Sequence, residues 1–241
     1  MTRKKTNSTQ VVRKICQVLF LGMTAFSLIR MDLTTTGIML LLSLLGGAFC
    51  CGWMCPFGFL QESLAVLGRR ILPRGRNPKL PAGLDRILRS LRYALLLIGG
   101  ASLLGIMLPD FLLKAASPLQ VFNALLKRNV AYVEPTAWTL FGFVALLSVF
   151  TERPFCRYLC PQGALHGLAG LGRVFTIKRN PEACVSCGIC DAACPAHIRI
   201  SEISQMRNPQ CINCLQCLSS CRRHKALKFG FLFDRKHGGA K

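Results

Sequence analysis

The stretch that decides the fold runs from residue 184 to residue 221 and holds eight cysteines in two runs of four. The first run reads CVSCGICDAACP over residues 184–195, and the second reads CINCLQCLSSC over residues 211–221. In each run two residues separate the first three cysteines from one another, and three residues precede the fourth. This is the spacing of bacterial ferredoxins with two clusters, in which the fourth cysteine of each run binds the other cluster. The sequence therefore predicts two [4Fe-4S] clusters.

The crossed spacing assigns the eight cysteines to two sets of ligands. The first cluster is predicted to bind Cys184, Cys187, Cys190 and Cys221, and the second is predicted to bind Cys211, Cys214, Cys217 and Cys194. Gly188 lies inside the first loop, where we expect the backbone to pass close to sulfur. Structural zinc is the alternative, because paired Cys-x2-Cys units also bind it. A tetrahedral zinc site has no use for crossed sets, so the spacing favours iron and sulfide.

The composition indicates a membrane protein with an uneven charge distribution. Hydrophobic residues make up 51% of the 241 residues, and the formal net charge is +21. The basic residues lie between apolar runs, a pattern typical of membrane orientation rather than of nucleic-acid binding. We therefore expect the membrane as a partner and no nucleic acid.

Four uncharged apolar runs predict four transmembrane helices, at residues 15–29, 37–55, 93–108 and 136–150. The predicted fold class is an α-helical membrane protein that carries a C-terminal α+β ferredoxin-like domain with two [4Fe-4S] clusters. The expected domains are a cytoplasmic arm (1–14), a four-helix membrane domain (15–172) and the ferredoxin-like domain (173–241).

The charges also predict the orientation of the chain. With four spans, thirteen basic residues of the arm and of the 62–92 connector fall on one side, against four on the other. Basic residues concentrate on the cytoplasmic side of membrane proteins. We therefore expect a multi-pass protein of the bacterial inner membrane with cytoplasmic termini and a cytoplasmic ferredoxin-like domain.

An internal repeat closes the second and fourth apolar runs. Residues 51–60 read CGWMCPFGFL and residues 156–165 read CRYLCPQGAL, so both copies read Cys-x3-Cys-Pro-x-Gly-x-Leu. Cysteines four apart on a helix face the same side. Together Cys51, Cys55, Cys156 and Cys160 could hold a further iron–sulfur cluster or a zinc ion. The alternative is a set of thiols that support packing or undergo redox exchange.

These motifs, in this order, make the chain resemble the NapH, MauN and NosR group of membrane polyferredoxins. The resemblance is greatest to the NapH type, the quinol dehydrogenase subunit that serves periplasmic nitrate reductases, and residues 156–167 resemble that family's second membrane motif. It implies an electron-transfer subunit of an oxidoreductase system, with quinol as the substrate and iron–sulfur or cytochrome proteins as redox partners. It does not name the terminal acceptor.

Two further side chains are candidates for a catalytic role. His166 and Glu62 each follow one copy of the repeat, and either could accept a proton during quinol oxidation; histidine is the side chain that titrates near neutral pH. A hydrogen-bonding role is the simpler interpretation of each. The basic run at residues 222–225 is either a solvated face or a docking patch for an acidic redox partner.

Two functions fit this pattern. The first is a relay that moves electrons between quinol and a partner oxidoreductase. The second is a maturation or assembly factor whose clusters supply electrons to ready the metal centre of another enzyme. The sequence contains no Cys-x-x-Cys-His haem motif, no phosphate loop and no dinucleotide fingerprint, which leaves electron transfer as the chemistry that it supports.

Overall fold

The computed structural model describes residues 8–25, 33–71, 81–103, 118–126, 133–223 and 226–231. These residues form two compact units, and each unit draws on distant parts of the chain. The first unit takes its residues from Met1–Gln17, Met31–Met54 and His166–Lys241, and the second from Val18–Arg30 and Cys55–Leu165.

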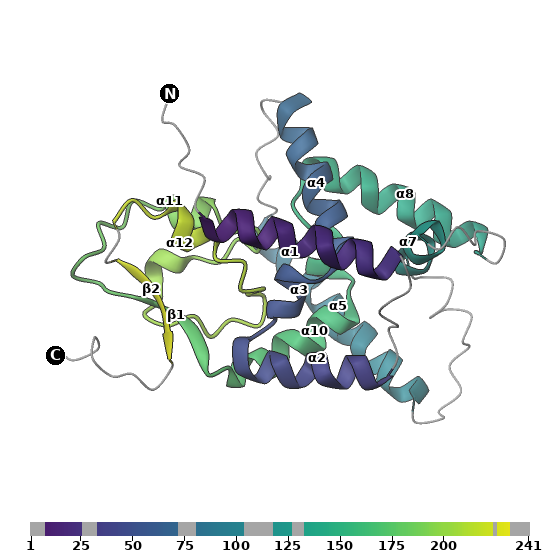
Figure 1. The fold of residues 1–241 in the computed structure, drawn as a ribbon, viewed down its shortest axis with the longest axis horizontal. Coiled ribbons are helices and arrows are strands. Elements are labelled where there is room, and N and C mark those ends of the chain that lie inside the picture. The colour runs from purple at the N-terminus through teal and green to yellow at the C-terminus, as the bar shows by residue number, and fades with distance from the viewer. Residues whose placement is uncertain are drawn as a thin grey trace. The chain divides into compact units, whose positions relative to one another are not determined.

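Helices predominate in the described residues (Figure 1). The helices are α1 (Ser8–Ala25), α2 (Leu33–Gly46), α3 (Phe49–Trp53), α4 (Pro56–Ile71), α5 (Ala82–Leu103), α7 (Pro118–Leu126), α8 (Pro135–Phe150), α9 (Pro154–Tyr158), α10 (Pro161–Ala169), α11 (Ile189–Ala192) and α12 (Gln216–Ser220). Two short 3-10 helices are η1 (Gly170–Gly172) and η2 (Ile200–Glu202), and the strands are β1 (Phe175–Arg179) and β2 (Leu227–Phe231). Several helices begin at a proline, whose fixed φ suits the first helical position.

The prediction of four transmembrane helices is wrong. Within the described ranges, each helix is either too short or too polar to cross a bilayer. Helices α2 and α8 have 14 and 16 residues, so they extend about 21 and 24 Å, below the roughly 30 Å of a hydrocarbon core. Helices α1 and α5 are longer, but α1 includes Arg13 and Lys14, and the first half of α5 is rich in charge. The prediction treated each apolar run as one complete helix, whereas the helices begin and end at other residues.

The basic connector predicted at residues 62–92 is also largely helical where it is described. Helix α4 continues through Arg69 and Arg70, and α5 takes in Arg86, Arg89 and Arg92. The sequence also predicts that Pro73, Pro78 and Pro81 keep the middle of the connector from being helical. Pro73 and Pro78 lie outside the described residues, and Pro81 directly precedes α5.

The sequence repeat is also a structural repeat. Helices α2, α3 and α4 are followed in the same order by α8, α9 and α10, and α3 and α9 start 105 positions apart, at Phe49 and Pro154. In the second unit α8 of the later copy packs on α4 of the earlier copy. In the first unit α2 of the earlier copy packs on η1, which directly follows α10. The first helix of the later copy therefore packs on the earlier copy, and the first helix of the earlier copy packs on the turn that directly follows the later copy.

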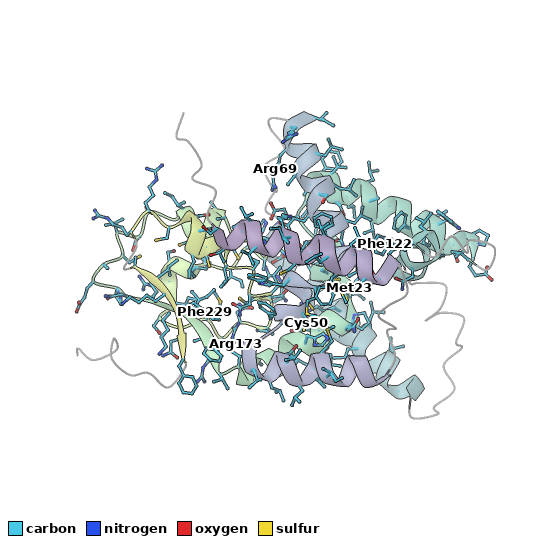
Figure 2. The ribbon with its side chains drawn as sticks, in the orientation of Figure 1. Met23, Cys50, Arg69, Phe122, Arg173 and Phe229 are labelled. Atoms are coloured by element: carbon cyan, nitrogen blue, oxygen red, sulfur yellow. The ribbon has the colours of Figure 1, made fainter. Side chains whose placement is uncertain are left out.

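An aromatic cluster forms the core of the second unit. Phe57 of α4 lies with its ring 5.3 Å from that of Phe155 of α9 and 5.5 Å from that of Phe122 of α7, which Figure 2 labels. Val144 of α8 completes the buried set. These contacts fix α9, and with it the second Cys-x3-Cys copy, against α4 and α8.

The ferredoxin-like part of the first unit combines a small sheet with short helices. Strands β1 and β2 are antiparallel, with Phe175 opposite Phe231 and Arg179 opposite Leu227 (Figure 1). The ring of Phe175 stacks on that of Phe229, labelled in Figure 2, at 6.1 Å. The core beneath is small and mixes isoleucines with cysteines of both runs.

Replacing Gly68 by alanine should separate α4 from α8. A Cβ atom at Gly68 would lie 2.0 Å from the carbonyl oxygen of Val149, so one helix must move. We expect a loss of about 1–3 kcal/mol in the free energy of unfolding, the usual cost of overpacking. Gly142→Ala in α8 is the matched control, because nothing lies within 4 Å of its Cβ position. It should leave the stability unchanged or raise it by up to about 1 kcal/mol. Chemical denaturation of both variants measures the difference, and equal stabilities would contradict the close packing.

Candidate iron–sulfur sites

The first candidate site is a cavity of about 240 Å³ in the first unit. Its walls include three cysteines of the first run and the last cysteine of the second run: Cys184, Cys187, Cys190 and Cys221. Arg179, Arg222 and Arg223 also line it. The cavity therefore combines four thiols with positive charge.

The second candidate site is a smaller cavity of about 20 Å³ in the same unit. Its walls include three cysteines of the second run and the last cysteine of the first run: Cys194, Cys211, Cys214 and Cys217. The remaining lining is apolar and includes Ile177, Ile200 and Met206. Four thiols around one cavity is the donor set that a [4Fe-4S] cube requires, so the residues of both sites fit that group, while the volume of the second cavity is enough for about one water molecule.

The two cysteine loops have the same unusual backbone. In the first loop Ser186 and Gly188 have positive φ (48° and 69°), and in the second the equivalent Asn213 and Leu215 have 52° and 57°. Such alternation turns successive backbone N–H groups toward one point, which creates a concave site for anions, including iron–sulfur clusters. Among the described residues, nothing beyond its chain neighbours lies within 4 Å of the Cβ position of Gly188, so its positive φ, rather than close packing, explains the glycine.

Burial controls the charge of several of these thiols. Removal from water raises the pKa of Cys190 to about 11 and that of Cys194 to about 12, and it also raises the pKa of Cys217 strongly. In contrast, hydrogen bonds from the backbone of Ser186 and the side chain of Arg179 lower the pKa of Cys184. Metal ligands must be thiolates, so loading releases protons from the buried cysteines and is favoured by higher pH.

Residues of α1, α2 and α3 form hydrogen bonds with the second cysteine loop, residues 211–217. Trp53 Nε1 donates to the carbonyl oxygen of Asn213 at 3.0 Å, and Asn213 Nδ2 donates to that of Gly46 at 2.7 Å. Gln10 Nε2 of α1 donates to the carbonyl oxygen of Cys214 at 3.0 Å. At Gly52, an added Cβ would lie 2.2 Å from the carbonyl oxygen of Ile212, so only glycine allows this approach.

Sequence reasoning missed this anchoring, although Gly52 and Trp53 stand inside the repeat. The equivalent residues of the second copy, Arg157 and Tyr158, have a different role in the second unit. Arg157 and the Tyr158 hydroxyl donate to Asp85 Oδ1 of α5 at 2.7 and 2.8 Å. Burial alone would raise the pKa of Asp85, but these partners outweigh it and leave that pKa lowered. The change from Gly52-Trp53 in the first copy to Arg157-Tyr158 in the second was the feature of the sequence that could have indicated these different contacts.

The repeat cysteines cap helices. Cys55 and Cys160 directly precede α4 and α10, and their Sγ atoms accept hydrogen bonds from the backbone of Gly58 (3.4 Å) and Gly163 (3.2 Å). The sulfur of Cys156 accepts a bond from Gln61 Nε2 at 3.4 Å. Burial raises the pKa of Cys156, and the nearby charges of Cys55 and Cys160 raise it further.

These three cysteines therefore gather in the second unit, whereas Cys51 belongs to the first unit. Across the described ranges, no three His, Cys, Asp or Glu side chains lie close enough to one another to hold a single metal ion. A metal or cluster at Cys51, Cys55, Cys156 and Cys160 stays a prediction.

The two catalytic candidates are both buried and hydrogen-bonded. Glu62 Oε2 accepts an ion-pair hydrogen bond from Arg153 at 2.9 Å, with both side chains buried. His166 Nδ1 lies 2.9 Å from the hydroxyl of Ser43, and burial lowers its pKa, which favours the neutral ring. Their predicted part in proton transfer stays a prediction.

Gly52→Ala should disturb the second site without touching a cysteine. Since the new methyl group would collide with the Ile212 carbonyl, the 211–217 loop must leave α3. We expect anaerobically reconstituted protein to lose about half of its iron, roughly four atoms of a total near eight if each site holds four. Gly83→Ala, at a position with open space around its Cβ, is the control and should keep the full amount. Iron retention by Gly52→Ala would show that the anchoring is dispensable.

Glu62→Gln should destabilise the second unit strongly. Loss of the carboxylate leaves the Arg153 guanidinium buried with an incomplete set of partners, which typically costs about 3–5 kcal/mol. Glu182→Gln, an exposed carboxylate, should change the free energy of unfolding by less than about 0.5 kcal/mol. Denaturation curves provide the comparison, and a stable Glu62→Gln protein would indicate that the ion pair has no structural role.

Two family descriptions match the chain. The description "4Fe-4S binding domain" matches residues 33–75 and 134–179, which include the two copies of the repeat. The description "4Fe-4S dicluster domain" matches residues 176–222, which include both cysteine runs. No solved structure matches the chain.

Several curated proteins are similar to the chain. A putative electron transport protein of Escherichia coli, YccM, is 36% identical over 193 residues, or 77% of this chain and 52% of YccM. An uncharacterised protein of Methanocaldococcus jannaschii is 28% identical over 94% of this chain and 98% of its own length. The ferredoxin-type protein NapH of Haemophilus influenzae is 29% identical over 84% of this chain and 68% of its own length. The chain thus spans about half of YccM and almost all of the archaeal relative.

Proposed function

Because the chain belongs to the ferredoxin-type polyferredoxins that include NapH, MauN, NosR and NirI, we propose that it relays single electrons through two [4Fe-4S] clusters. Cys184, Cys187, Cys190 and Cys221 would hold the first cluster. Cys211, Cys214, Cys217 and Cys194 would hold the second. The observation that carries the proposal is the lining of the two cavities, each of which takes three cysteines from one run and the fourth from the other.

A bound [4Fe-4S] cluster supplies reversible one-electron chemistry, and the surrounding residues set its potential. At the first site, three arginines favour the reduced form, which carries one more negative charge. At the second site, the apolar lining keeps water away and disfavours added negative charge. The first site should therefore have the higher reduction potential, and electrons should pass from the second site to the first.

The first copy of the repeat holds the second site against α3. Through Trp53 and Gly52, the 211–217 loop is fixed to α3, which carries Cys51. A donor near α3 would therefore reach the second site before the first. By resemblance we propose quinol as that donor, and the location at the inner membrane stays a prediction.

The maturation alternative uses the same two clusters. The two functions differ in the electron donor, because a maturation factor could receive its electrons from a donor other than quinol. Reduction of the intact protein by a quinol analogue under anaerobic conditions therefore separates the two functions.

Serine replacement of one ligand from each set tests the assignment. Cys190→Ser and Cys217→Ser should each remove one cluster, so that reconstituted protein holds about four iron atoms instead of about eight. The electron paramagnetic resonance signal that remains should differ between the two variants, since each keeps a different site. Cys16→Ser in α1 is the control and should keep all the iron. If the two variants kept the same signal, the division of the cysteines into two sets would be wrong.

A further inference from the structure

The two cysteine loops share one backbone but differ in exposure. In the first loop Val185 is 61% exposed and Cys187 is also exposed. In the second loop the equivalent Ile212 is only partly exposed and Cys214 is buried at 8%. The loop of the first site is therefore the more exposed of the two in the first unit.

Contacts of the first unit explain the difference. The second loop lies against α1 and α3, whose Gln10 and Trp53 side chains donate to its carbonyl oxygens. The carbonyl oxygen of Gly52 in turn accepts bonds from Arg13 and Gln17 of α1, at 3.1 and 2.9 Å. Helices α1 and α3 therefore cover part of the second loop, and the first loop is the more accessible to other molecules.

Positive charge lies beside the 184–190 loop. Arg222 and Arg223 are exposed and line the first cavity with Arg179. Of the nearby carboxylates, that of Asp191 accepts hydrogen bonds from Ser201, and that of Glu202 is paired with Arg199, while Glu182 is exposed. Over residues 173–241, twelve lysines and arginines stand against four aspartates and glutamates. A surface of this kind attracts and orients an acidic partner.

We propose that the 184–190 loop, together with Arg222 and Arg223, is the docking face for an acidic electron-transfer protein. The inference rests on the proposed function, and it adds which cluster exchanges electrons with the partner and what charge the partner carries. Docking places the partner's redox centre against Val185 and Cys187, next to the first cluster. The two arginines contact carboxylates of the partner around this apolar point.

The experiment uses flavodoxin, a small acidic flavoprotein, as the probe and follows its reduction by the reduced full-length protein in a stopped-flow instrument. Arg222→Gln/Arg223→Gln removes two charges at the proposed face. Arg199→Gln/Arg207→Gln removes two charges from exposed positions that do not line either cavity, so the net charge of the two variants is the same. At about 0.15 M ionic strength, where charges are screened beyond about 8 Å, the first variant should react about tenfold more slowly than the wild type. The control should stay within about twofold, because only charges at the docking face still act on the partner.

Titration calorimetry with both proteins oxidised supplies a readout that needs no electron transfer. Binding should weaken in the first variant and persist in the control. Equal losses in both variants, or no loss in either, would overturn the docking face. Absence of iron or of a reducible signal in the wild type would instead refute the proposed function, and calorimetry would still decide whether the face binds the acidic protein.

Discussion

Each of the two cysteine runs must supply one cysteine to the site of the other run, and this constraint organises the first unit. Cys221 has to return to the cavity of the first run, and Cys194 to that of the second. The connection brings α11 and α12 into contact and places β2 beside β1. The apolar core beneath is small, and cysteines supply part of it. Because a cluster binds the folded site and not the unfolded chain, its binding free energy adds to the free energy of unfolding. The clusters should therefore contribute much of the stability of the ferredoxin-like part.

The duplicated helices provide the support for this arrangement. Both copies place a cysteine directly before a helix, where its sulfur accepts a backbone N–H bond from a glycine three residues later. The copies differ at five of their ten positions, and two adjacent ones have different neighbours. Gly52 and Trp53 hold the ferredoxin loop, while Arg157 and Tyr158 hold α5. The same motif thus contacts a different neighbour in each unit.

Features that depend on the local spacing of residues could be predicted from the sequence, whereas contacts between residues far apart in the chain could not. The cysteine runs and the repeat were recognisable because their ligand spacing and helix capping depend on residues a few positions apart. The membrane spans were wrong because an apolar run says nothing of where its helix ends, and α5 includes the charged residues from Asp85 to Arg92. The bond from Trp53 to Asn213 joins residues 160 positions apart, so no local pattern contains it. The ion pair of Glu62 with Arg153 was missed for the same reason, since 91 positions separate them.

The most direct measurement of the central claim is an iron and sulfide analysis of the anaerobically purified full-length protein, combined with electron paramagnetic resonance during a redox titration. Two cubes require about eight iron and eight sulfide atoms per chain, and two reduction steps should be resolved. The step at the higher potential should belong to the cluster that Cys190→Ser removes. Zinc in place of iron, or a single cluster per chain, would contradict the account.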